Sequence, residues 1–212
     1  MDIDKRLPGL EEAQAALEEA SKMNPGPWVE HSRTVAIACK CIAEHCPDID
    51  EHKAFLLGLL HDIGRRVGVV SERHMLEGYR YCMERGWSDN ARVCITHSFI
   101  VKDIRSAIGE WDVPKEDFDF VSKYIGDIRY TDYDLLVQFC DSVALHDGCC
   151  LLEKRQMDIV RRYGIHPYTV RRYERLLEIK KYFENKIGCS IYSILPNVTE
   201  ATFGGELLQK AN

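Results

Sequence analysis

Helix-forming segments follow one another along nearly the whole chain, whereas strand patterns are scarce. Residues 10–22 are rich in Ala, Leu, Glu and Gln, which are strong helix formers, and the turn Asn24-Pro25-Gly26-Pro27 ends this segment. Apolar periodicity and capping residues predict further helices over residues 28–45, 51–63, 74–85, 88–96, 114–124, 132–145, 153–163 and 168–185. This succession predicts an all-α fold, a single helical bundle.

The C-terminal segment shows weaker signals. From Gly188 onward the helical pattern fades, residues 191–194 alternate like a short strand, and residues 197–205 are typical of a loop. No long Ser/Pro/Gly-rich linker divides the chain. We therefore expect one domain over residues 1–212 with a short irregular C-terminal tail.

The composition is that of an ordinary globular protein, with 45% hydrophobic residues and a formal net charge of −6. A membrane-spanning helix needs about 20 apolar residues, and the longest such run, 54–60, is too short. The N-terminus has no apolar core or cleavage site, so no secretory signal is expected. The nine cysteines could be disulfides, metal ligands or buried thiols. Their odd number and spacing favour reduced thiols in a cytoplasmic protein.

Positive charge is concentrated near the C-terminus. Residues 151–190 contain ten Lys and Arg against five Asp and Glu, a net of +5, which leaves −11 for the rest of the chain. A solvated helical face is one explanation of this segment, and a basic wall that attracts an anionic substrate is the other. A nucleic-acid partner is disfavoured because the whole chain is acidic and lacks a known binding motif.

Two carboxylates occur in strongly apolar sequence. Asp141 lies inside the predicted helix 132–145, and His61-Asp62 directly follows the apolar run 54–60. A carboxylate buried without a partner is costly, so a cationic group should meet each one. A metal ion is one candidate.

Histidines accompany these carboxylates. Adjacent residues on a helix point about 100° apart, so His61 and Asp62 reach one ion only near a helix end, which Ile63-Gly64 supplies. His31 lies on a different predicted helix. A helical bundle builds a metal site from side chains that converge in this way. Imidazole and carboxylate ligands suit Fe, Mn, Zn or Mg better than a soft thiolate site would.

The order His31, His61-Asp62, Asp141 resembles the pattern of the HD-domain superfamily of metal-dependent phosphohydrolases. The dipeptide extends to His61-Asp62-Ile63-Gly64, the HDIG form that many members carry. The surroundings of His74 and His97 resemble the two additional histidines of members that hold two metal ions. The resemblance implies a metal-binding core over residues 24–145, with C-terminal helices and the tail in residues 146–212.

The resemblance also implies a role for each matched residue. A first divalent ion would be bound by His31, His61, Asp62 and Asp141. Asp62 would bridge to a second ion held by His74 and His97, although His74 could also be a helix-start histidine on a wet surface. Iron is the favoured metal, with Mn, Mg or Zn as alternatives. A metal lowers the pKa of bound water from 15.7 to about 7 in favourable sites, so a water between the ions would be the nucleophile.

Basic residues near these ligands would serve the substrate. Arg65 stands where many relatives have lysine, three residues after Asp62, and its fork of donors fits two phosphate oxygens. We expect Arg65 to act with Asp62 in catalysis, the alternative being a surface arginine after a helix end. Lys102, about one turn beyond His97, is a further substrate-binding candidate. The implied reaction is hydrolysis of a phosphoester or phosphoanhydride in a small phosphorylated molecule, with a nucleotide favoured.

Two other functions are compatible with the same residues. Di-iron oxygenases of the superfamily have a similar ligand order, and a non-catalytic regulatory module could keep the fold. The Gly-Tyr-Pro signature of the cyclic-dinucleotide phosphodiesterase branch does not follow the histidines. The pattern leaves the oligomeric state open.

Overall fold

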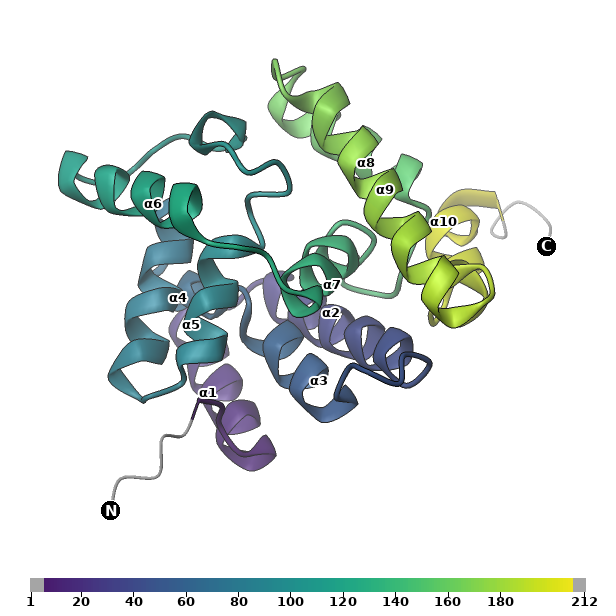
Figure 1. Cartoon of the computed structure of the whole chain (residues 1–212), viewed down its shortest axis with the longest axis horizontal. Helices are drawn as coiled ribbons and strands as arrows, with labels where there is room; N and C mark the ends of the chain where they lie inside the picture. Colours follow the sequence, from purple (N-terminus) through teal and green to yellow (C-terminus); the bar gives the residue numbers. More distant parts are fainter. Residues whose placement is uncertain (1–5, 208–212) are drawn as a thin grey trace.

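The computed structural model describes residues 6–207, and within that range the chain forms ten α-helices and three short 3₁₀ turns (Figure 1). The helices are α1 (Leu10–Met23), α2 (Trp28–Ala43), α3 (Glu51–Leu60), α4 (Arg73–Glu84), α5 (Ser88–Thr96), α6 (Lys115–Asp127), α7 (Asp132–Asp141), α8 (Leu152–Tyr163), α9 (Thr169–Ile187) and α10 (Val198–Leu207). The 3₁₀ turns are η1 (Ile63–Val67), η2 (Ile104–Ser106) and η3 (Ile191–Ser193). The described residues form no strand, only an isolated bridge between Ala144 and Cys149, and the predicted all-α fold is confirmed.

Three apolar clusters hold the helices together. The largest joins α2, α3, α7 and α9 and includes the fully buried Phe139 and Phe183. A second cluster packs α1 against α2 and α3 through Leu17 and Leu59, and a third joins α4 and α5 to α6 around Val121. Burying a side chain of the Leu or Phe class stabilises a fold by about 1.5–3 kcal/mol. These clusters therefore fix the positions of the helices that carry the predicted ligands.

Helices α2 and α3 approach each other closely at Gly58. A Cβ atom at this position would lie only 2.9 Å from the Cα of Ala36, so a larger residue would push the two helices apart. This close crossing brings His31 on α2 near His61 at the end of α3. The glycine inside the apolar run 54–60 thus has a packing role.

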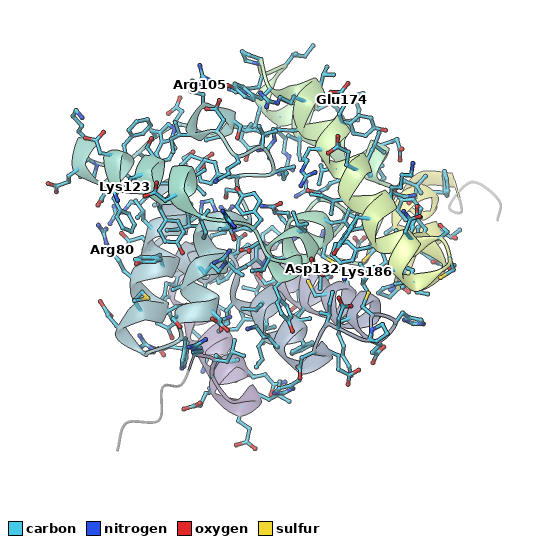
Figure 2. The ribbon with its side chains drawn as sticks, viewed as in Figure 1. Arg80, Arg105, Lys123, Asp132, Glu174 and Lys186 are labelled. Carbon is cyan, nitrogen blue, oxygen red and sulfur yellow. The ribbon has the colours of Figure 1, made fainter. Side chains whose placement is uncertain are left out.

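Helix α9 is held against the core by packing and by charge. Leu176, Ile179 and Phe183 are buried at the spacing of one helix face. The Nζ of Lys186 lies 2.7 Å from Oδ2 of Asp132 at the start of α7, and these two side chains meet in Figure 2. The basic C-terminal segment is therefore attached to the helices of the predicted ligand core.

Two helices end three or more residues earlier than predicted. Helix α3 ends at Leu60 rather than 63 because the chain continues as η1, and α7 ends at Asp141 rather than 145. After Asp141 the Oγ of Ser142 donates to the carbonyl of Gln138 (2.8 Å), and the chain then folds back so that Leu145 N donates to Gly148 O (2.8 Å). Both ends place a predicted ligand where the backbone leaves the helix.

The prediction for the C-terminal segment was wrong. Residues 191–194 do not form a strand, because no extended neighbour is available among the described residues and the chain instead turns as η3. The predicted loop is helix α10, which lies over the turn at Gly148. The N–H of Leu151 donates to Oγ1 of Thr202 (3.1 Å). Helix α10 is stabilised by contacts with residues that are distant in sequence, and local helix propensity gives no information about such contacts.

None of the helices in the described part of the chain is both long and apolar enough to cross a bilayer. All nine cysteines are free thiols, seven of them buried. The prediction of reduced core thiols agrees with this arrangement. The single-domain organisation stays a prediction.

Candidate metal centre

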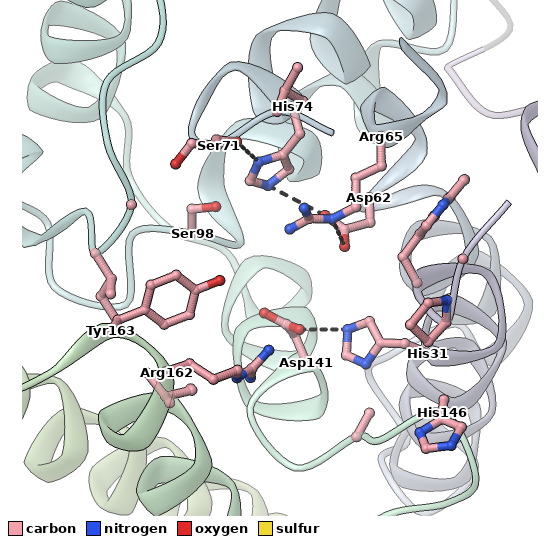
Figure 3. A pocket seen from close by; sticks show the side chains of 18 of the residues that line it. His31, Asp62, Arg65, Ser71, His74, Ser98, Asp141, His146, Arg162 and Tyr163 are labelled. Atoms are coloured by element: carbon pink, nitrogen blue, oxygen red, sulfur yellow. Dashed lines mark hydrogen bonds and ion pairs between the residues drawn. The ribbon is translucent and has the colours of Figure 1, made fainter. Parts of the chain in front are cut away.

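The structure brings all six predicted ligands to one place, where the ends of several helices converge. Figure 3 labels four of them, His31, Asp62, His74 and Asp141. His31 lies in the first turn of α2, and His74 lies at the start of α4. His61 and His97 directly follow α3 and α5, and Asp141 is the last residue of α7. The remaining ligand, Asp62, lies between α3 and η1. Because each residue lies near a helix end, helix packing and local chain turns together position the side chains.

The ligand atoms form two groups that share His61. The first contains His31, His61 and Asp141, and the second contains His61, Asp62 and His97, with the ligand atoms of each group within 4.8 Å of one another. In the first group, Nε2 of His31 lies 2.9 Å from Oδ1 of Asp141, and Nε2 of His61 lies 3.8 Å from the same oxygen. In the second, Nε2 of His97 lies 3.6 Å from Oδ1 of Asp62.

His74 adjoins the second group. Its Nε2 lies 3.4 Å from Oδ1 of Asp62 and 3.4 Å from Nε2 of His97. Nitrogen ligands about 2.1 Å from a tetrahedral ion are about 3.4 Å apart, so these separations are compatible with shared coordination. The side chain is buried, which rules out the alternative of a histidine on a wet surface.

Contacts with the backbone determine which ring nitrogen of three histidines carries the hydrogen. In each of His61, His74 and His97, Nδ1 lies against a main-chain carbonyl, so Nδ1 carries the hydrogen and Nε2 presents its lone pair. The acceptors are the carbonyl oxygens of Gly58 (2.7 Å), Ser71 (2.5 Å) and Val93 (3.0 Å). This tautomer is the one that a metal-binding imidazole needs, and each Nε2 lies within 4 Å of an Asp62 oxygen.

Two buried atoms of the centre have no hydrogen-bond partner. These are Nε2 of His61 and Oδ1 of Asp62. An unsatisfied buried polar atom costs about 1–3 kcal/mol, and both atoms are electron-pair donors that a cation would satisfy. The set of nitrogen and carboxylate ligands, without a thiolate, fits a divalent ion such as Fe, Mn or Zn.

The charge states also match those that metal binding needs. Burial by itself would raise the pKa of Asp62, but Arg65 and the nearby histidines outweigh burial and hold that pKa well below its usual range. The pKa of Asp141 is likewise lowered, because the hydrogen bond from His31 outweighs the effect of burial. Burial lowers the pKa of His74 to about 3, with Arg65 adding to the effect, and burial also lowers the pKa of His97. Ionised carboxylates and neutral imidazoles are the ligating forms.

Gly64 sets the distance between η1 and α4. A Cβ atom at Gly64 would lie 1.8 Å from the carbonyl oxygen of His74 and 2.4 Å from the N of Gly78. Only a residue without a side chain allows this approach. The glycine of the His61-Asp62-Ile63-Gly64 motif therefore brings His74 next to Asp62.

The two predicted substrate-binding residues differ in their placement. Arg65 points inward, with Nε 2.5 Å from Oδ2 of Asp62, and lines the cavity beside the centre. The structure does not bring Lys102 to the site: its side chain is exposed and does not line the cavity. The prediction placed Lys102 about one turn beyond His97, but the chain leaves the helix after Thr96, so nearness in sequence does not bring Lys102 to the centre. Substrate binding by Lys102 therefore stays a prediction that this geometry does not support.

A cavity of about 900 Å³ opens beside the centre, and two of its residues were missed by the sequence reasoning. Arg172 on α9 is buried, and its Nη1 donates to the carbonyls of Ser98 and Ser106, both at 3.0 Å. Glu72 accepts a hydrogen bond from Gly109 N (2.7 Å) through Oε1, while its Oε2 is buried without a partner. The excess of positive charge in residues 151–190 indicated this wall, but it did not identify the residue that turns inward.

Comparison with known proteins gives one result. A family model described as the HDOD domain matches residues 12–123. No curated protein and no solved structure matches the chain. The matched region contains five of the six converging residues, and Asp141 and helices α8 to α10 follow it. Because the match covers more than half of the sequence and the helical fold agrees with it, the chain belongs to the HDOD domain family, within the HD-like superfamily.

Proposed function

We propose that this protein is a metal-dependent phosphohydrolase of the dinuclear HDIG type. It would cleave a phosphoester or phosphoanhydride in a small phosphorylated molecule, with a nucleotide favoured. The observation that carries the proposal is the convergence of four histidines and two carboxylates, in which Nε2 of His61 and Oδ1 of Asp62 are buried without partners. A purely structural cluster would be expected to satisfy these atoms internally.

The ligands divide between two ions in this proposal. His31, His61, Asp62 and Asp141 would hold one ion, and Asp62 would bridge to a second ion held by His74 and His97. Iron is favoured, with Mn, Mg or Zn as alternatives. Bound divalent ions would lower the pKa of a water nucleophile and neutralise charge that develops on a phosphoryl group.

Arg65 supplies the substrate contact closest to the ligands. Its guanidinium is held beside Asp62 and about a third of the side chain is exposed to the cavity. A guanidinium binds two phosphate oxygens through parallel hydrogen bonds, and it remains charged at any pH of interest. In the proposed reaction Arg65 orients the phosphate against the metal centre and stabilises negative charge on it.

The test combines metal analysis with turnover. The protein purified without chelators is expected to contain about two metal ions per chain and to release phosphate or a nucleotide from a member of a phosphoester panel. Asp62→Asn keeps the side-chain volume but removes the charge, so it should lose metal and reduce turnover at least 100-fold. His52→Gln, at an exposed position of α3, is the matched control and should resemble the wild type.

Lack of turnover across the panel with Fe, Mn, Mg and Zn would contradict the proposal. Consumption of O₂ by the iron-loaded protein without phosphate release would indicate the oxygenase alternative instead.

A regulatory module is the second candidate, and the family match favours it because HDOD domains are often non-catalytic. In that case the cluster would serve the structure of the domain and would not need to bind metal. The distinguishing measurement is complementation of a deletion strain with His61→Ala. Restoration of the phenotype by this variant would support the regulatory role, and failure to restore it by a stable, folded variant would support catalysis.

A further inference from the structure

Helix α8 turns a polar face toward the cavity. Arg155, Asp158, Ile159 and Arg162 all line it, and their positions i, i+3, i+4 and i+7 form one face of a helix. A helix that packs on a core carries apolar residues on such a face, but Leu152 is the only buried residue of α8. The face of α8 that lines the cavity, its inner face, is therefore suited to contact a polar molecule bound there.

The arginines of this face have no acidic partner. Among the described residues no carboxylate forms an ion pair with Arg155 or Arg162, and Asp158 on the same face pairs with Lys154 at 3.7 Å. Nε of Arg155 is buried without a hydrogen-bond partner. Nε of Arg162 donates to a backbone carbonyl, that of Asp158 (3.3 Å). The guanidinium charges are thus available to an anion.

The arginines and the metal centre share one cavity. Figure 3 shows Arg162 and Tyr163 entering it from the side of α8, opposite Arg65 and His74. The cavity volume of about 900 Å³ lies near the upper end of the range for small-molecule sites, and a single phosphate group held at the ligands would leave most of it empty. A substrate that extends from the predicted metal-binding side chains to α8 would fill the cavity.

We propose that the inner face of α8 is a second anion subsite, in which Arg155 and Arg162 bind a phosphate group other than the one that is cleaved. The proposal rests on the proposed phosphohydrolase function and narrows its substrate class. The substrate would carry two or more phosphate groups, as a nucleoside diphosphate or triphosphate does. Paired guanidinium groups suit this chemistry because each one binds phosphate oxygens in a fork. The subsite lies outside the region that the HDOD model matches.

Binding of inorganic tripolyphosphate tests the subsite without turnover. Calorimetry on metal-stripped protein should show that tripolyphosphate binds more tightly than inorganic phosphate. Arg155→Gln/Arg162→Gln should weaken tripolyphosphate binding at least ten-fold. Arg171→Gln removes one positive charge from an exposed position of α9 that does not line the cavity. It is the charge-matched control for Arg162→Gln and should change binding less than two-fold.

Arg162 is exposed, so Arg162→Gln alone is expected to fold and should weaken binding about three-fold or more. Equal affinities in the wild type and the double variant would overturn the subsite, as would the absence of tripolyphosphate binding to the wild type. Tighter binding of a single-stranded oligonucleotide than of tripolyphosphate would overturn the assignment to a small polyphosphate.

A turnover measurement separates this inference from the proposed function. With metal-loaded protein, the ratio of kcat/KM for adenosine diphosphate to that for p-nitrophenyl phosphate should fall about ten-fold in the double variant. An unchanged ratio would overturn the subsite even if the enzyme is active. If the wild type cleaves neither compound nor any other phosphoester, the proposed function fails, and tripolyphosphate binding still decides whether the α8 subsite exists.

Discussion

The imidazole of His61 lies between the two carboxylates of the centre. Its Nε2 is 3.9 Å from Oδ2 of Asp62 and 3.8 Å from Oδ1 of Asp141, and its side chain is fully buried. The carbonyl of Gly58 holds the opposite ring nitrogen at 2.7 Å. An imidazole whose Nδ1 is held by a hydrogen bond and whose Nε2 has no partner is typical of a metal ligand, since hydrogen bonds to the non-ligating nitrogen fix the orientation of the ring.

Single substitutions should separate the two proposed ions. Asp62 bridges the two ions in the proposal, so Asp62→Asn is expected to lower the metal content toward zero. His74 contacts only the Asp62 side, so His74→Ala should retain about one ion per chain. Elemental analysis and calorimetric titration of both variants would measure this difference. Retention of two ions by His74→Ala would show that this histidine is not a ligand.

Thiol reactivity should follow burial. Cys189 is the single exposed cysteine among the nine, whereas burial raises the pKa of Cys149 to about 12 and that of Cys150 to about 11. Because the thiolate is the reactive form, a disulfide reagent at pH 8 should modify one thiol quickly in the folded protein. Cys189→Ser should abolish this fast phase, and its persistence in that variant would contradict the structure.

At the scale of the elements, the contact between η1 and α4 controls the site. Gly64 lies where the carbonyl of His74 leaves no room for a Cβ atom. The same contact determines how far Asp62 and His74 are from each other, so helix packing and ligand geometry depend on one residue. The contact at Gly58 has the corresponding role between α2 and α3.

Gly64→Ala should therefore destabilise the protein and weaken metal binding together. Overpacking of this kind costs about 1–3 kcal/mol in the free energy of unfolding, which denaturant titration would measure. Gly126→Ala is the matched control, because no atom lies within 4 Å of a Cβ at this position of α6. In a helix this change stabilises by about 0.5–1 kcal/mol. Wild-type stability and metal content in Gly64→Ala would contradict the close approach.

At the scale of the whole molecule, the centre joins segments separated by more than a hundred residues. Nε2 of His31 reaches Asp141 across 110 positions of sequence, and Arg172 connects α9 to the loop that follows α5. The cavity is completed by helices that the HDOD model does not include. Ligand binding in this centre should therefore stabilise the arrangement of the helices around it.

Metal removal should lower the melting temperature. A ligand that binds only the folded state stabilises it by about 2.7 kcal/mol at 100 times its dissociation constant. Differential scanning fluorimetry of the chelator-treated protein should show a lower midpoint that rises again with added Mn or Fe. Asp62→Asn, which removes the residue that bridges both ions, is the control, and its midpoint should not respond to metal. An equal response in both proteins would place the stabilising ion elsewhere.

Local chemistry explains which predictions of structure were correct. The helix over residues 88–96 was predicted with its observed bounds, because Gly86, with its positive φ, is a local signal that ends the preceding helix. Helix α10 was missed because its support comes from Gly148 and Leu151, which are distant in sequence. Lys102 was placed near the site because it follows His97 closely in sequence, but the chain leaves the helix after Thr96 and the Lys102 side chain is exposed away from the cavity.

The sequence by itself determined the all-α fold, because helix periodicity is carried by neighbouring residues. The resemblance of its His and Asp pattern to the HD-domain superfamily indicated the six side chains that converge. Only the tertiary structure decided that Glu72 and Arg172 line the cavity, and that Arg155 and Arg162 face it from α8. Periodicity shows which residues share a face of a helix, but the packing of distant helices determines what that face meets.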